Sequence, residues 1–190
     1  MYIKQKMTKI LAISVLMLIG SVVATEDQQF SIPEGPELGQ PATAEEVAAL
    51  SINVFSDGRG LPEGSGSVRQ GASIYQSKCI VCHGAGGLGG SAEPLAGAKM
   101  GLTGEWPEKT IGTLWPYATT LFDFTRRSMP MTAPGSMSND ETYALTAYLL
   151  YLNGIVDKNL VLNKETLMQV KMPNVDGFIN IYEQKKQKNK

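Results

Sequence analysis

The sequence predicts an all-α fold, because three segments combine the start signals of helices with helical spacing of their apolar residues. The first segment, residues 67–77, begins with Ser67, whose hydroxyl can cap a helix. The second, residues 115–127, begins with Trp-Pro, and proline is well tolerated in the first turn. The third begins with the capping box Ser138-Asn139-Asp140-Glu141 and ends at Asn153-Gly154. These helices are expected to form one compact domain.

Shorter helices are expected over residues 44–50, where Thr43 can act as cap, and over residues 164–170, which Pro173 would stop. Residues 57–66 are expected to form a loop and residues 84–104 an irregular segment, because glycine and proline interrupt both. Gly71 lies inside the first long helix, where glycine costs about 1 kcal/mol relative to alanine. A close crossing by another helix would explain it, and simple tolerance is the alternative.

The first 24 residues have the order of a secretory signal peptide. Lys4, Lys6 and Lys9 precede an apolar run over residues 10–23, and Ala24 offers a cleavage point. The run is shorter than the roughly 20 residues that span a bilayer, so an uncleaved anchor is the weaker alternative. We therefore expect export to the periplasm, cleavage near Ala24 and no stable membrane insertion.

The composition limits the possible binding partners and indicates the domain organisation. Removing the leader takes away three of the 17 basic residues and none of the 18 acidic ones, which leaves a formal charge of −4. This charge argues against a nucleic-acid partner. We expect an N-terminal arm and loop over residues 25–66, a central domain over 67–154, and an extension over 155–190 that ends in a basic tail.

The motif Cys79-Ile80-Val81-Cys82-His83 predicts one covalently attached c-type haem. Two thiols at this spacing can add to the two vinyl groups of the porphyrin, and the following histidine can bind the iron. A redox dithiol needs no adjacent histidine, and a zinc site needs further ligands. The chain contains only two cysteines and one histidine, so haem is the favoured interpretation. The central domain over residues 67–154 is therefore expected to be a haem domain with one haem.

Because His83 is the single histidine, the second axial ligand must be another residue type, and thioether sulfur is usual in electron carriers. Met129 is the first choice, because it follows one long helix and precedes the next, with Pro130 to stiffen the loop. Met131 is the close competitor. Met137 is expected to be the apolar staple of the helix that follows it. Met100, Met168 and Met172 are expected to be packing residues.

Residues around the haem can also be proposed. The carbonyl of Pro94 is expected to accept the second ring N–H of His83, with Glu93 or a water as alternatives. Five side chains could bond the haem propionates, although core packing is an equal possibility for the aromatic ones. They are Arg59, Trp115, Tyr117, Arg126 and Arg127.

Together with the haem motif, five runs resemble the cytochrome subunit of sulfur or sulfite dehydrogenases over roughly residues 38–178. The runs are DGRGLPEGSG (57–66), WPYATTLFD (115–123), RRSMP (126–130), YALTAYLLYLNG (143–154) and MPNVDGF (172–178). The resemblance implies a class I cytochrome c fold, a molybdenum-cofactor dehydrogenase subunit of the Sox-system type as electron donor, and a soluble cytochrome c as acceptor. It also supports Met129 as axial ligand, because the Arg-Arg-x-Met-Pro run matches.

The sequence therefore favours a non-catalytic electron-transfer subunit of an oxidoreductase. Both cysteines are used by haem, so neither a molybdenum thiolate ligand nor an iron–sulfur site can be built from this chain. The alternative is a haem-based enzyme or gas sensor, which requires an open sixth position on the iron. The choice between sulfite and sulfane sulfur as the partner's substrate stays open.

Overall fold

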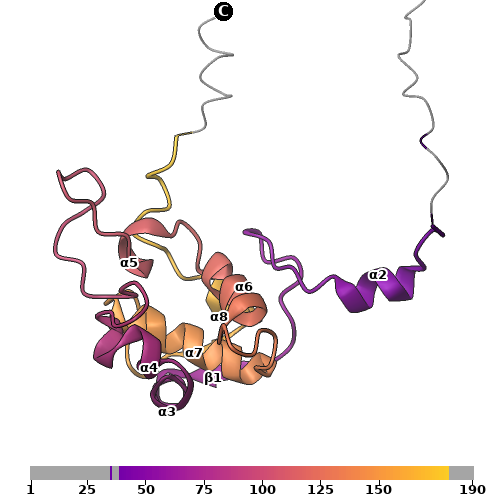
Figure 1. Cartoon of the computed structure of the whole chain (residues 1–190), viewed down its shortest axis with the longest axis horizontal. Helices are drawn as coiled ribbons and strands as arrows, with labels where there is room; N and C mark the ends of the chain where they lie inside the picture. The colour runs from indigo at the N-terminus through magenta and orange to yellow at the C-terminus, as the bar shows by residue number, and fades with distance from the viewer. Residues whose placement is uncertain (1–34, 36–38, 180–190) are drawn as a thin grey trace, which may run out of the picture. The chain divides into compact units, whose positions relative to one another are not determined.

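The computed structural model describes residue 35 and residues 39–179, and the described chain is mostly helical (Figure 1). The predicted signal peptide and the basic tail lie outside the described residues. In chain order the elements are α2 (Ala44–Leu50), β1 (Ser65–Ser67), α3 (Val68–Lys78), α4 (Ile80–His83), η1 (Ala85–Gly87), α5 (Ile111–Leu114), α6 (Ala118–Ser128), α7 (Asn139–Leu152), β2 (Val161–Asn163) and α8 (Lys164–Met168). The predicted all-α class is confirmed, and no described helix is long and apolar enough to cross a membrane.

Two of the three long helices begin where the sequence predicts. Ser67 caps α3 and pairs reciprocally with Gln70, and Ser138 caps α7 in the same way with Glu141. The third long helix differs, because α6 begins at Ala118 and not at Trp115. Trp115 has an extended backbone, as expected for a residue before proline, and ends the unpredicted helix α5.

A two-stranded antiparallel sheet corrects the prediction that residues 57–66 are entirely loop. Ser65–Ser67 pairs with Val161–Asn163, with Gly66 opposite Leu162. A Cβ at Gly66 would overlap the backbone of Ala144, so glycine lets β1 lie directly on α7. This strand is set by a contact 78 positions away along the chain, and not by local propensity.

Helices α3 and α7 cross closely at Gly71. A Cβ at this position would overlap the carbonyl oxygen of Ala144, so the predicted close helix crossing is confirmed. Tyr75 and Tyr148 extend the contact, with ring centroids 5.4 Å apart. The crossing fixes the two helices that form most of one wall of the site described below.

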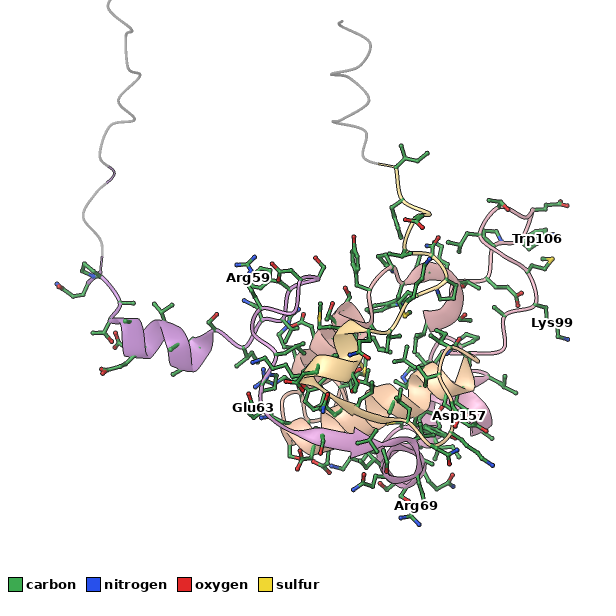
Figure 2. All side chains as sticks on the ribbon, turned by 180° about the vertical axis from the view of Figure 1, so that it is seen from behind. Arg59, Glu63, Arg69, Lys99, Trp106 and Asp157 are labelled. Carbon is green, nitrogen blue, oxygen red and sulfur yellow. The ribbon has the colours of Figure 1, made fainter. Side chains whose placement is uncertain are left out.

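The core is centred on α7 and continues beyond the predicted haem domain. Phe122 of α6 and Tyr143 of α7 are fully buried, with ring centroids 4.5 Å apart. Leu162, Leu167 and Met172 follow α7 and are also fully buried in this core. The described part of the C-terminal extension is therefore part of the fold. By contrast, the loop with Lys99 and Trp106 projects from the domain (Figure 2).

Candidate haem site

One cavity contains the residues of the haem motif and both candidate methionines. Cys79, Cys82 and His83 line it, and so do Met129 and Met131. The cavity has a volume of about 220 Å³. Because nearly 50 positions separate the motif from the methionines, only the fold brings these groups together.

The motif residues face the cavity because of a change in helix direction. Cys79 is the C-cap of α3, and the single turn α4 follows and ends at Gly84, whose φ is +72°. Cys82 and His83 are three and four positions beyond Cys79, a spacing that places side chains on one face of a helical turn. Val81, between the cysteines, borders the same cavity and is 81% exposed.

These residues fit a covalently attached haem. The two cysteines form no disulfide, and both thiols line the cavity beside the imidazole. Burial raises the pKa of the Cys79 thiol to about 11, the opposite of what a redox-active dithiol requires. Within the described residues no cluster of three or more His, Cys, Asp or Glu side chains could bind a metal ion, which disfavours the zinc alternative.

His83 is oriented by a backbone carbonyl. Its Nδ1 lies 3.2 Å from the carbonyl oxygen of Glu93, so the structure gives this contact to Glu93 and not to Pro94. The loop is bonded back to the motif, because the Ala92 amide donates to the Cys82 carbonyl at 3.0 Å. Donation from Nδ1 to Glu93 leaves the lone pair of His83 on Nε2, the nitrogen required for an axial ligand.

The two candidate methionines differ in burial. Met129 is the C-cap of α6, is half-buried and packs against the core. Met131 is 77% exposed, although it also borders the cavity. Met137 and Met172 are buried in the core, away from the cavity lining. Burial therefore favours Met129 as the axial ligand, and the assignment remains a prediction.

The five residues proposed for the propionates do not line this cavity. Arg59 is at the surface (Figure 2), where its Nε donates to Asp57 at 2.8 Å and its guanidinium covers the Phe55 ring. Trp115 packs edge-on against Phe124, with ring centroids 5.6 Å apart.

Of the other three residues, Arg126 and Arg127 are hydrogen-bonded elsewhere and Tyr117 lies at a different hollow. Arg126 donates to the Ile52 carbonyl at 3.2 Å, and Arg127 donates from Nε to Asp123 at 2.9 Å. Tyr117 borders a separate hollow at the start of α6. Their proposed contacts with the propionates stay predictions that these partners do not favour.

Sequence reasoning missed much of the cavity wall. Tyr75 donates from its hydroxyl to the Gly84 carbonyl at 2.8 Å, which ties α3 to the end of the motif. Burial raises the pKa of this hydroxyl to about 12, so it stays a donor. Leu145 and Leu149 of α7 supply apolar wall. Helical spacing placed Tyr75 and α7 in the core, but no local signal separates cofactor contact from core packing.

Comparison with known proteins agrees with this geometry. The cytochrome c family model matches residues 68–153. A chain in the crystal structure of the sulfane dehydrogenase SoxCD from Paracoccus pantotrophus is 42% identical, with a TM-score of 0.72, over 80% of this chain and 75% of that chain. No curated protein sequence matches significantly. The cavity residues and the family model together identify the cofactor as one covalently attached c-type haem.

Proposed function

This chain belongs to the class I c-type cytochromes of the Sox system, and on that premise we propose that it is the electron-transfer subunit of a molybdenum-dependent sulfur-compound dehydrogenase. Its donor is a separate molybdenum-cofactor subunit, and its acceptor is a soluble cytochrome c in the periplasm. The likeness to a chain of a sulfane dehydrogenase supports the first of these roles. The partner's substrate is either sulfite or sulfane sulfur.

The observation on which the proposal rests is that His83 and Met129 line the same cavity. When bound, the haem supplies one-electron chemistry at its iron, and filled axial positions suit transfer without substrate binding. A histidine with a methionine also gives a higher reduction potential than two histidines. These properties fit a subunit that receives electrons from a catalytic partner and passes them on.

The chain's own residues supply the environment for this transfer. Leu145 and Leu149 form apolar wall and limit access of water to the cavity. Glu93 fixes the His83 ring, so the ligand need not reorient when the charge of the site changes. Val81, which lies between the two cysteines and is exposed, marks the edge at which the haem motif meets solvent. A partner at this edge can exchange electrons without entering the cavity.

The decisive experiment mixes the purified full chain with its molybdenum-cofactor subunit and either sulfite or a sulfane-sulfur substrate. We expect the haem absorption spectrum to change to the reduced form only when subunit and substrate are both present. Soluble cytochrome c added next should be reduced in turn. Carbon monoxide binding to the chemically reduced wild-type chain, together with no reduction by the subunit, would instead support the open-iron enzyme or gas sensor.

A further inference from the structure

Helix α2 buries none of its residues against the rest of the described chain. It is seven residues long, and its two largest apolar side chains are exposed, Val47 by 53% and Leu50 by 83%. These two side chains are three positions apart and therefore share one face of the helix. Glu45 and Glu46 lie outside that face. The helix is amphipathic, but its apolar face has no partner within the described chain.

Within the described residues, the interactions that hold α2 in its helical form are local. The Thr43 amide donates to the Glu46 carboxylate at 2.8 Å, and the Glu46 amide donates to the Thr43 hydroxyl at 3.2 Å. Isolated helices shorter than about 12 residues are marginal in water, and most helical stability in proteins comes from burying an apolar face. A capped helix that buries nothing is suited to packing against another molecule.

The chain that follows α2 is fixed to the domain. The Val54 amide donates to the buried Asp123 carboxylate at 2.8 Å, and Arg126 donates to the Ile52 carbonyl at 3.2 Å. Each of these two hydrogen bonds has one partner on α6, the helix whose C-cap is Met129. The segment after α2 is thus attached to the element that presents the proposed axial ligand.

We propose that α2 is a docking element that packs its Val47–Leu50 face onto the molybdenum-cofactor dehydrogenase subunit. The proposal rests on the proposed function, because it names the surface through which this chain recognises that partner. Docking by α2 supplies binding energy outside the haem domain. The exposed edge of the haem motif at Val81 can then be the place of electron exchange. The contact there can be small, because it need not provide the affinity of the complex.

The extent of the structural likeness supports this choice of partner. The SoxCD match covers 80% of 190 residues, about 152, whereas the family model covers the 86 residues from 68 to 153. At least 66 matched residues therefore lie outside the family model, and only 37 residues follow position 153. At least 29 matched residues must precede position 68. The general cytochrome c domain lacks this segment, and a chain of a dehydrogenase has it.

Two other occupants fit the helix less well. An anionic membrane surface would repel Glu45 and Glu46, which lie directly beside the apolar face. A second copy of this chain could pair α2 with α2, but two seven-residue helices bury far less than the roughly 1,200 Å² of a stable interface. A dehydrogenase subunit that also contacts the haem domain meets the area requirement with two separate surfaces.

The test compares Leu50→Asp with Ala49→Asp in the full-length, haem-loaded chain. Both variants add one charge to α2, but only the first places it on the apolar face. We expect Leu50→Asp to weaken binding to the molybdenum-cofactor subunit from the same organism at least tenfold, and Ala49→Asp to change it less than twofold. Hydrogen exchange at amides 44–50 should slow at least tenfold in the wild-type complex. Both variants should keep the wild-type haem spectrum.

The outcomes separate this proposal from the proposed function. If the wild-type chain is reduced by the subunit, while Leu50→Asp binds equally well and amides 44–50 exchange as fast as before, docking by α2 is refuted and the function stands. If the wild-type chain neither binds the subunit nor is reduced by it, both fail. A shift from dimer to monomer in Leu50→Asp alone, or binding of α2 to anionic vesicles, would assign the helix to one of the rejected occupants.

Discussion

Asp123 accepts a hydrogen bond from the Val54 amide at 2.8 Å, although 69 positions separate the two residues. Asp123 is buried on α6, and Arg127 donates to the same carboxylate from one turn further along the helix. The carboxylate thus joins the segment before the haem domain to the helix that ends at Met129. Val54 itself is buried in the core.

Asp123→Ala should lower the free energy of unfolding by roughly 2 kcal/mol, because it leaves a buried amide without an acceptor and Arg127 without its partner. Asp123→Asn keeps one oxygen for the Val54 amide and should lose clearly less. Chemical denaturation of the haem-loaded protein gives both values. Equal losses for the two variants would mean that the hydrogen bond to Val54 adds nothing to the stability.

Gly71→Ala tests the crossing of α3 and α7. Alanine in place of a helical glycine normally gains about 1 kcal/mol, but here its Cβ would overlap the Ala144 carbonyl. We expect a net loss of about 2 kcal/mol, the cost of overpacking a tight contact. Ser73→Ala, on the exposed side of the same helix, is the matched control and should change the stability by less than about 0.5 kcal/mol. A gain for Gly71→Ala would contradict the close approach.

Local signals predicted the starts of α3 and α7, which are fixed by capping side chains. Ser67 and Ser138 cap their helices where expected, because a capping box forms within four residues. Strand β1 and the true start of α6 were missed. Gly66 is placed by contact with Ala144, and the extended backbone of Trp115 follows from the proline after it. The effect of the proline on Trp115 can be read from the sequence, whereas the contact that places Gly66 cannot.

The haem site also has features that the sequence predicts and features that it does not. The spacing of Cys79, Cys82 and His83 is itself the chemical requirement for haem attachment, so it was readable in sequence. The partner of the His83 ring is a backbone carbonyl, and every residue has one. Choosing Glu93 over Pro94 needs the path of the loop, which is set by bonds such as that from Ala92 to Cys82. Side-chain identity says little about such a contact.

Acid should weaken the contact between α3 and α7. The Lys78 ammonium donates to Glu141 at 2.6 Å and, with the Ser138 amide, lowers the pKa of this carboxyl below its ordinary value of 4.5. The stability from a lowered pKa is present above the unfolded value and is lost as pH falls through the folded one. Glu141→Gln should therefore flatten the decline of stability below about pH 4.5.

The size of this effect is limited, because both side chains are about one-third exposed. An exposed pair of this kind contributes roughly 0.5–1 kcal/mol, and salt reduces it. Urea denaturation between pH 7 and pH 3 measures it, with Glu105→Gln on an exposed loop as control. If the two variants show the same pH profile, the pair with Lys78 does not contribute to acid stability.

Met129→Ala should remove the methionine ligand and leave the cavity otherwise intact, since only a half-buried side chain at the end of α6 is shortened. We expect the oxidised protein to lose the weak long-wavelength band of methionine-ligated ferric haem, its reduction potential to fall, and carbon monoxide to bind the reduced form. Met131→Ala is the matched control, because this residue borders the same cavity but is mostly exposed. Its spectrum and potential should stay close to those of the wild type. If Met131→Ala loses the band and Met129→Ala keeps it, the axial ligand is Met131, and the exposed loop after α6 must fold inward when haem is bound.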